Sequence, residues 1–509
     1  MKGALLVCGT HSDAGKSVVA AGICRWLHRQ GISVAPFKAQ NMSLNSVVTL
    51  DGGEVGRAQA VQAAAAGLEP ETAMNPVLIK PSGERHSQVI VMGKPYANAD
   101  ARSYGAMKHA LRPIVASALH ELRERYDVVV CEGAGSPAEI NLREHDLTNM
   151  WLAQEGSLPT VIVADIDRGG VFASLFGTVA LLDPADQAQV AGFVINKFRG
   201  DDSILAPGLA QLEQRTGRPT LGVLPFVEDL WMDVEDSLAL DASRPENPAA
   251  PGGDTLDVAV LRLRWLSNFT DADALGTEPG VRVRFTRSAA DIERADLVLI
   301  PGTKATVEDL ARLRAIGLDS VLKARAAAGG PILGICGGYQ LLGVRIEDDV
   351  ESGRGIVEGL GLLPVSTRFE ADKILRRRQG SSPLLGTAAS GYEIRHGRVA
   401  RAGGENLLVG DDGEPDGCAN GSVMGTAWHG ALEHDNFRRA LLSRVAAARG
   451  RNFVAGRGAF AAARAARLDA LGDLVTNHLD TAALTDLIET RTSSDLPTIE
   501  TEVRPCCAS

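Results

Sequence analysis

Two residues of this 509-residue chain have the surroundings that a nucleophilic pair needs. Cys336 ends an apolar segment, PILGIC, and is followed by two glycines and a segment typical of a helix. A sharp strand-to-helix turn exposes the side chain at its apex, and backbone N–H groups beyond it can hold an oxyanion. A free cysteine is often only a small buried hydrophobe, but the glycines and the segment TAWHG favour catalysis. We therefore predict that Cys336 is a nucleophile and that His429 shuttles its proton.

The strand–Cys–Gly–Gly turn resembles that of the class I glutamine amidotransferases, in which a Cys–His pair releases ammonia from glutamine. On this resemblance, the N–H groups of Gly302 and Gly337 are predicted to form the oxyanion hole, although the segment PGT around Gly302 also suits a simple turn. Many amidotransferases have a glutamate two residues after the histidine, where this chain has Ala431. The pair is therefore expected to act as a dyad, and Glu433 is expected on a solvated helix face.

A phosphate-binding motif lies near the N-terminus, where GTHSDAGKS (9–17) separates an apolar strand from an apolar helix. Backbone N–H groups of such a loop hold phosphates, its lysine reaches the β- and γ-phosphates, and its hydroxyl binds Mg²⁺. The glycines are one residue further apart than in the common P-loop, a spacing that resembles the dethiobiotin synthetase group. The predicted ATP-binding residues are Gly9, Thr10, Asp13, Ala14, Gly15, Lys16, Ser17 and Asn196.

Polar side chains also follow other apolar runs of this N-terminal region. Glu132, Asp167 and Asn196 each come at or just after a predicted strand end. Because parallel strands end at one edge of a sheet, these residues are expected to outline one crevice. The sequence predicts Mg²⁺ ligands at Ser17, Glu132 and Asp167. Two further lysines, Lys38 and Lys80, are predicted either to contact an acceptor carboxylate or simply to be solvated.

Short apolar runs alternate with amphipathic stretches along most of the chain, which is typical of a doubly wound α/β fold. The pattern stops at a stretch rich in proline and glycine and then restarts. The predicted fold is a P-loop (dethiobiotin synthetase-like) domain followed by a class I glutamine amidotransferase-like α/β domain. The predicted parts are a P-loop domain over 1–240, a linker over 241–255, an amidotransferase domain over 256–445, a helical segment over 446–489 and a disordered tail over 490–509.

Composition excludes several classes of function. The net charge of −11 and an aromatic content of 4% argue against nucleic-acid binding. No apolar run approaches the ~20 residues that a membrane helix needs. The seven cysteines are scattered and show no metal-type pairing, which indicates a reducing cytoplasm. The sequence leaves a homo-oligomer open.

The ordered motifs of the whole chain, to about residue 485, closely resemble those of the cobyric acid synthases, the glutamine-dependent corrinoid amidases of cobalamin assembly. The motifs include PFKAQNMSLNS (36–46), EGAGSPAEINL (132–142), DIDRGGVFASLFGT (165–178), SNFTDADAL (267–275) and GYEIRHGR (391–398).

The resemblance implies a reaction with two substrates besides ATP and Mg²⁺, namely glutamine and a corrinoid. ATP phosphorylates a peripheral carboxylate of cobyrinic acid a,c-diamide, and ammonia then displaces phosphate to give an amide. Phosphorylation turns a poor electrophile into a good one, and Lys16 screens the repulsion between the two anions. The family repeats this step at the b, d, e and g side chains.

Two rival interpretations share some of these motifs. Cobyrinic acid a,c-diamide synthase shares both domain types but forms other amides. A P-loop switch ATPase with an inactive glutaminase-like domain is a different class, but such ATPases carry an additional lysine near the start of the loop. This chain has Gly9, Thr10 and His11 there, and it retains both Cys336 and His429.

Overall fold

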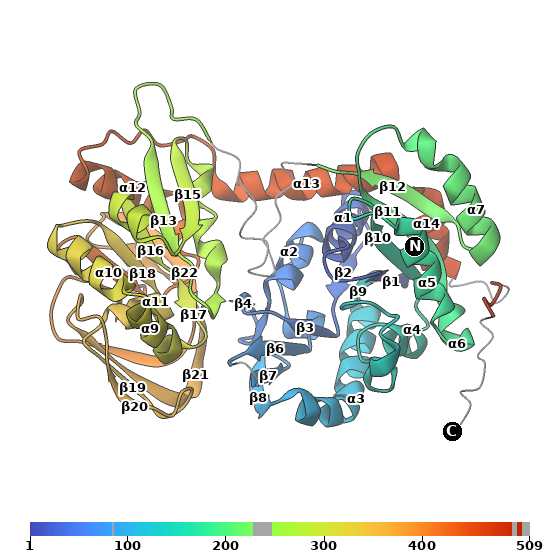
Figure 1. Cartoon of the computed structure of the whole chain (residues 1–509), viewed down its shortest axis with the longest axis horizontal. Coiled ribbons are helices and arrows are strands. Elements are labelled where there is room, and N and C mark those ends of the chain that lie inside the picture. Colours follow the sequence, from blue (N-terminus) through green and yellow to red (C-terminus); the bar gives the residue numbers. More distant parts are fainter. Residues whose placement is uncertain (84–85, 228–246, 491–495, 501–509) are drawn as a thin grey trace.

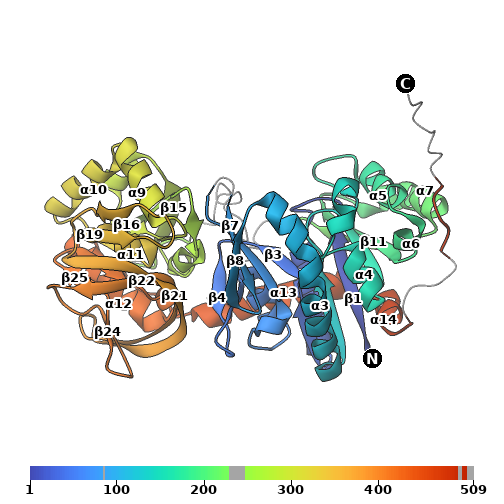
Figure 2. The same cartoon turned by 90° about the horizontal axis from the view of Figure 1, so that it is seen from below.

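The computed structural model describes residues 1–83, 86–227, 247–490 and 496–500. It contains two α/β units side by side, which the long helix α13 (Phe460–His478) joins along one side (Figures 1 and 2). No helix of the described residues is long and apolar enough to cross a membrane. The doubly wound two-domain α/β fold predicted from the sequence is confirmed.

The N-terminal unit is built on a six-stranded parallel sheet with the order β12-β11-β10-β1-β9-β2. Its strands other than the edge strand β12 are almost entirely buried, as expected where helices cover both faces. The strands are β1 (Gly3–Gly9), β2 (Val34–Phe37), β9 (Val128–Glu132), β10 (Thr160–Asp165), β11 (Val190–Phe198) and β12 (Thr220–Pro225). The helices on one face are α3 (Ala101–Arg125), α4 (Met150–Gly156), α5 (Val171–Ala180) and α7 (Ala206–Thr216). Helices α1 (Lys16–Arg29) and α2 (Arg57–Ala65) lie on the other face.

An insertion between β2 and α3 carries a smaller sheet toward the other unit (Figure 1). Its strands run in the order β3-β6-β7-β8, and a separate hairpin, β4–β5, precedes α2. The bounds are β3 (Gln40–Met42), β4 (Ser46–Val48), β5 (Glu54–Gly56), β6 (Val77–Pro81), β7 (Ser87–Val91) and β8 (Lys94–Ala99). This insertion therefore forms the N-terminal unit's side of the interface between the two units, which is called the seam below.

The C-terminal unit has a second six-stranded sheet with the order β15-β13-β16-β18-β26-β25, parallel except for β25. Its strands are β13 (Leu256–Leu261), β15 (Val281–Thr286), β16 (Leu297–Ile300), β18 (Ile332–Ile335), β25 (Cys418–Asn420) and β26 (Val423–Thr426). Its main helices are α9 (Thr306–Ala315), α10 (Leu318–Ala327), α11 (Gly337–Leu342) and α12 (Asp435–Ala448). A long hairpin of β21 (Val365–Ser382) and β22 (Thr387–Arg401) turns toward the N-terminal unit (Figure 1).

The last helices return to the N-terminal unit. Helix α13 packs on α1, and Gly22 permits the close approach because a Cβ there would lie 2.8 Å from the Leu471 carbonyl oxygen. Arg25 pairs with Asp469 at 2.9 Å across the same contact. Helix α14 (Thr481–Thr490) packs against β1. The apolar side chains of α14 and of the later part of α13 therefore belong to the core of the first unit, whereas Phe460 at the start of α13 packs in the core of the C-terminal unit.

Two predicted segments lie partly outside the described residues. The predicted linker begins at residue 241, and residues 228–246 are not among those described. Of the predicted disordered tail, residues 491–495 and 501–509 lie outside the description. Within the described part, the Ile499 N–H donates to Gln187 Oε1 at 2.8 Å.

Candidate functional site

Cys336 occupies the turn between β18 and α11. Its backbone has φ 51° and ψ −110°, a region that non-glycine residues rarely adopt and that is typical of nucleophile elbows. The Cys336 N–H donates to the Thr426 carbonyl at 2.8 Å, which fixes the turn to β26. Gly338 allows the turn to pack closely, since a Cβ there would lie 2.0 Å from the Ile300 carbonyl oxygen. Cys336 and His429 line the same cavity.

The structure adds a carboxylate to this pair. Asp271, in the 3₁₀ turn η5 (Phe269–Ala272), places Oδ2 2.7 Å from His429 Nδ1. Its other oxygen accepts from the Gly430 N–H at 2.7 Å. The interpretation of the site as a dyad is therefore wrong in its geometry, because a buried acid orients the histidine. Sequence spacing could not reveal Asp271, which lies 158 residues before His429.

The surroundings of His429 favour its charged form. Burial opposes the imidazolium, but the charge of Asp271 and the interaction with Cys336 outweigh burial and raise the pKa of His429 to about 10. The ring also stacks on Tyr392, with centroids 5.6 Å apart and planes 28° from parallel. The imidazole is therefore fixed in orientation from two sides.

Both predicted oxyanion glycines lie beside this pair. A Cβ on Gly302 would lie 2.9 Å from His429 Cε1, and one on Gly337 would lie 2.8 Å from the Thr303 nitrogen. Neither position has room for a side chain. The structure therefore brings Gly302 and Gly337 together with Cys336 and His429.

The structure separates the two lysines that the sequence grouped. Lys80 lies in the wall of the cavity that holds Cys336, where it donates to Ser46 Oγ at 2.7 Å and pairs with Glu54 at 3.1 Å. Lys373, from β21 of the other unit, pairs with the same carboxylate. Burial opposes the charge of Glu54, but Lys373 and Lys80 outweigh it and lower the Glu54 pKa to about 2. Lys80 is therefore part of a seam between the units and not of the phosphate crevice.

The loop over residues 9–17 has the shape of a phosphate cradle. Gly15 has φ 102°, and a Cβ there would lie 1.9 Å from Asn196 Nδ2. That amide donates to the Ala14 carbonyl at 3.0 Å and so braces the loop. Lys16 Nζ donates to the His11 carbonyl at 2.9 Å, which holds the ammonium across the loop. These residues fit a nucleotide's phosphate groups.

The other loop residues hold the cradle in place. The Thr10 N–H donates to the Val163 carbonyl at 3.0 Å, which ties the loop to β10. Asp13 has φ 61°, and its carboxylate lies 3.7 Å from Arg168.

Glu132 lies at the centre of the crevice. Its Oε1 accepts from Ser17 Oγ at 2.8 Å and from Lys38 Nζ at 3.0 Å, and Gln62 donates to its Oε2. Burial raises the pKa of Glu132, but Lys38 and the hydrogen bonds outweigh burial and lower it below its ordinary value. The hydroxyl and carboxylate oxygens are donors of the kind that Mg²⁺ prefers, so this pair fits the metal.

Asp167 lies at the end of the neighbouring strand and is less enclosed. Its side chain is 45% exposed, and Oδ1 accepts from Arg199 at 3.1 Å. The nearby Asp165 is buried and pairs with Lys197 at 2.7 Å. Among the described residues, no group of three or more His, Cys, Asp or Glu side chains could hold a metal ion. A magnesium ion here would therefore complete its coordination with water molecules and phosphate oxygens.

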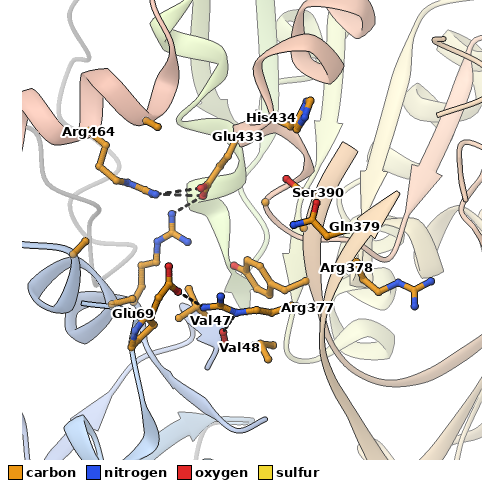
Figure 3. Close-up of a pocket in the computed structure, with 18 of the residues that line it drawn as sticks. Val47, Val48, Glu69, Arg377, Arg378, Gln379, Ser390, Glu433, His434 and Arg464 are labelled. Atoms are coloured by element: carbon orange, nitrogen blue, oxygen red, sulfur yellow. Dashed lines mark hydrogen bonds and ion pairs between the residues drawn. The ribbon is translucent and has the colours of Figure 1, made fainter. Parts of the chain in front are cut away.

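A larger cavity of about 700 Å³ lies along the seam between the units (Figure 3). Glu433 stands in its wall and pairs with Arg57 at 2.6 Å and with Arg464 at 3.2 Å. Glu433 does not lie on a solvated helix face, and that expectation is wrong. Arg377 pairs with Glu69 at 2.6 Å elsewhere in the wall, so ion pairs join the units around this cavity.

The fold and the two sites define a class, in which a P-loop nucleotide-binding domain is joined to a glutamine amidotransferase domain. Residues 5–238 match the CobQ/CobB/MinD/ParA nucleotide binding domain, and residues 257–437 match the CobB/CobQ-like glutamine amidotransferase domain. The chain belongs to the cobyric acid synthase family, as its sequence motifs indicated.

The relatives that show the family match nearly the whole chain. A cobyric acid synthase of Frankia casuarinae is 57% identical, over 98% of this chain and 99% of the relative. Those of Rhodococcus jostii and Streptomyces avermitilis are 56% and 57% identical, over 98% of this chain and 98% and 99% of theirs. A P-loop domain in a synthase of this family implies the use of ATP.

Proposed function

We propose that this protein uses ATP and glutamine to amidate the b, d, e and g carboxylates of cobyrinic acid a,c-diamide in the cytoplasm. The observation that carries the proposal is the presence, in one chain of this family, of a Cys336–His429–Asp271 arrangement and a Lys16–Ser17–Glu132 crevice. The acidic net charge gives no support to a nucleic-acid or membrane partner.

In the amidotransferase domain, Cys336 Sγ attacks the side-chain amide carbon of glutamine. The N–H groups of Gly302 and Gly337 accommodate the developing oxyanion. His429, held by Asp271, passes a proton to the departing ammonia, and water then releases glutamate from the thioester. Asp271 keeps the reacting nitrogen of His429 turned toward Cys336.

In the nucleotide-binding domain, an acceptor carboxylate oxygen attacks the γ-phosphorus of ATP, and ADP leaves. The loop N–H groups and Lys16 hold the phosphates and stabilise the charge that shifts during transfer. When bound, Mg²⁺ supplies further charge neutralisation, and Ser17 and Glu132, with Asp167 as a third candidate, would hold it. Lys38, which pairs with Glu132 at 3.0 Å, would attract the acceptor carboxylate. Ammonia then attacks the acyl carbon, and phosphate leaves.

Mass spectrometry of the corrinoid product tests the proposal and its nearest rival. The protein is supplied with cobyrinic acid a,c-diamide, ATP, Mg²⁺ and glutamine. We expect up to four successive carboxyl-to-amide conversions. In a parallel assay with cobyrinic acid as the corrinoid, only two conversions would instead indicate an a,c-diamide synthase, and ATP hydrolysis without any amide in either assay would contradict both.

We expect Asp271→Asn to reduce kcat/KM for glutamine by about 10²- to 10⁴-fold, because an amide no longer fixes the charged, oriented imidazole. The carboxylate raises the pKa of His429, so its removal lowers that pKa. The alkaline limb of the pH profile for glutamine hydrolysis, expected near pH 10 in the wild type, should therefore move to lower pH. Glutamate release measured across pH checks both effects.

Ammonium-dependent amidation by Asp271→Asn is the control and should stay close to the wild-type rate, since the nucleotide-binding domain is unaltered. A variant with wild-type glutamine kinetics and an unmoved alkaline limb would show that Asp271 has no role in orienting His429.

We expect Glu132→Gln to raise the Mg²⁺ concentration needed for half-maximal amidation by about 10- to 100-fold, since an anionic ligand becomes neutral. The change also removes the partner of the buried Lys38 charge, so the maximal rate should fall as well. A Mg²⁺ titration of ammonium-dependent amidation provides the measurement. An unchanged titration midpoint would remove Glu132 from the metal site, and the same titration with Asp167→Asn tests the second carboxylate.

A further inference from the structure

Two asparagines form a reciprocal contact across the seam between the domains. The Phe269 N–H donates to Asn45 Oδ1 at 3.3 Å, and the Ser46 N–H donates to Asn268 Oδ1 at 2.8 Å. All four residues are buried. Each domain therefore offers a side-chain oxygen to the other domain's backbone, and the contact lies only two residues before Asp271.

The same surface of the nucleotide-binding domain also reaches the histidine segment. The Arg57 N–H donates to the Asn45 carbonyl at 2.9 Å, so the two residues are held together. The Arg57 guanidinium pairs at 2.6 Å with Glu433, which lies in the 3₁₀ turn η7 (Ala431–Glu433) just after His429. One surface of the nucleotide-binding domain thus contacts both segments that carry the histidine and its acid.

Neither of these segments belongs to the main sheet of the amidotransferase domain. Asp271 and Glu433 lie on short 3₁₀ turns, which have few internal hydrogen bonds of their own. Asn268, which begins the first turn, has φ 49°, a conformation that costs free energy and persists where neighbouring contacts impose it. The hydrogen bonds from Asn45 and Ser46 and the ion pair from Arg57 are contacts that can impose such a conformation.

We propose that Asn45 and Arg57 of the nucleotide-binding domain are positioning residues for the glutaminase, which hold the Asp271 and His429 segments in line with Cys336. The inference rests on the proposed function and deepens it. Glutamine hydrolysis then depends on the docking of the two domains. The carboxylate that orients His429 belongs to one domain, but its position is set by the other.

Asn45→Ala tests the proposal, because Asn45 lies in the nucleotide-binding domain and outside the lining of the Cys336 cavity. We expect kcat/KM for glutamate release to fall by about 10- to 100-fold, as small misplacements of catalytic groups produce. Ammonium-dependent amidation by the same preparation should stay within about twofold of the wild type, since misplacement affects only the reaction whose groups it moves. Arg57→Gln should change glutamate release in the same direction. A matched control is Glu69→Gln, which weakens the ion pair that Glu69 makes with Arg377 across the same seam and should leave both rates unchanged.

The pH profile separates positioning from a general loss of structure. If Asp271 is released from His429, the alkaline limb of glutamine hydrolysis should move to lower pH in Asn45→Ala, as in Asp271→Asn. Asn268→Gly, which keeps the left-handed backbone but loses the side-chain oxygen, should show the same shift.

Equal losses of glutamate release and ammonium-dependent amidation in Asn45→Ala, or wild-type glutamate release, would overturn the inference. Glutamate release is measured without a corrinoid. A failure of the wild type to amidate the corrinoid would therefore reject the proposed function. The effect of Asn45→Ala on glutamate release would still test the positioning role.

Discussion

Cys336→Ser is expected to lower glutamine-dependent amidation by at least about 10³-fold, because a serine hydroxyl stays protonated where a thiol can ionise. The neighbouring His429 is held in its charged form by Asp271, so it is a poor base for a hydroxyl. Amidation with ammonium at high concentration and mildly alkaline pH should persist. The measurement is product amide formation with each nitrogen source.

His429→Ala should give the same separation of the two nitrogen sources. Each variant serves as its own control, since ammonium-dependent product shows that the nucleotide-binding domain is folded and active. If Cys336→Ser kept glutamine-dependent amidation near the wild-type rate, the strained turn at Cys336 would be a purely structural feature.

Lys16→Ala is expected to lower amidation with glutamine and with ammonium alike, by at least about 10²-fold, as the loss of one preorganised charge at a transferring phosphate does. Both nitrogen sources need the activated carboxylate, so neither can bypass the lysine. Product amides and ADP release are measured together. Glutamate release without corrinoid should survive, because Cys336 and His429 lie in the other domain.

Ammonium-dependent amidation near the wild-type rate in Lys16→Ala would contradict the role of this lysine. Loss of glutamate release as well would show that the substitution disturbs the whole chain, and Lys16→Arg, which keeps the positive charge, then distinguishes charge from packing.

The sequence could predict the parts of each site that are local. The turn around Cys336 and the loop ending at Lys16 each depend on a few consecutive residues between a strand and a helix, so their backbone shape is readable from type and spacing. Glu132 could be predicted from its place at a strand end, since parallel strands end at one edge of the sheet.

The parts that the sequence did not reveal depend on contacts between distant segments. Asp271 meets His429 only when η5 folds against the segment 429–430. Lys38 and Lys80 are both lysines near the ends of strands, so the sequence does not distinguish them. Lys38, just after β2, pairs with Glu132, whereas Lys80, in β6, pairs with Glu54 at the seam. The residues next to Glu433 in sequence give no sign of its ion pairs, because its partners Arg57 and Arg464 come from other parts of the chain.

The return of α13 and α14 to the N-terminal unit has a consequence for synthesis on the ribosome. Leu468, Leu471 and Val475 cover the apolar side of α1, and Ile488 lies against β1. The core of the N-terminal domain is therefore complete only after residues 468–488 have been synthesised. Synthesis proceeds at ~5–20 residues per second, so the apolar surface of the N-terminal domain stays exposed until α13 and α14 are made. Exposed apolar surface promotes aggregation of the nascent chain during that time. An early stop codon before α13 would thus damage the nucleotide-binding domain as well as shorten the chain.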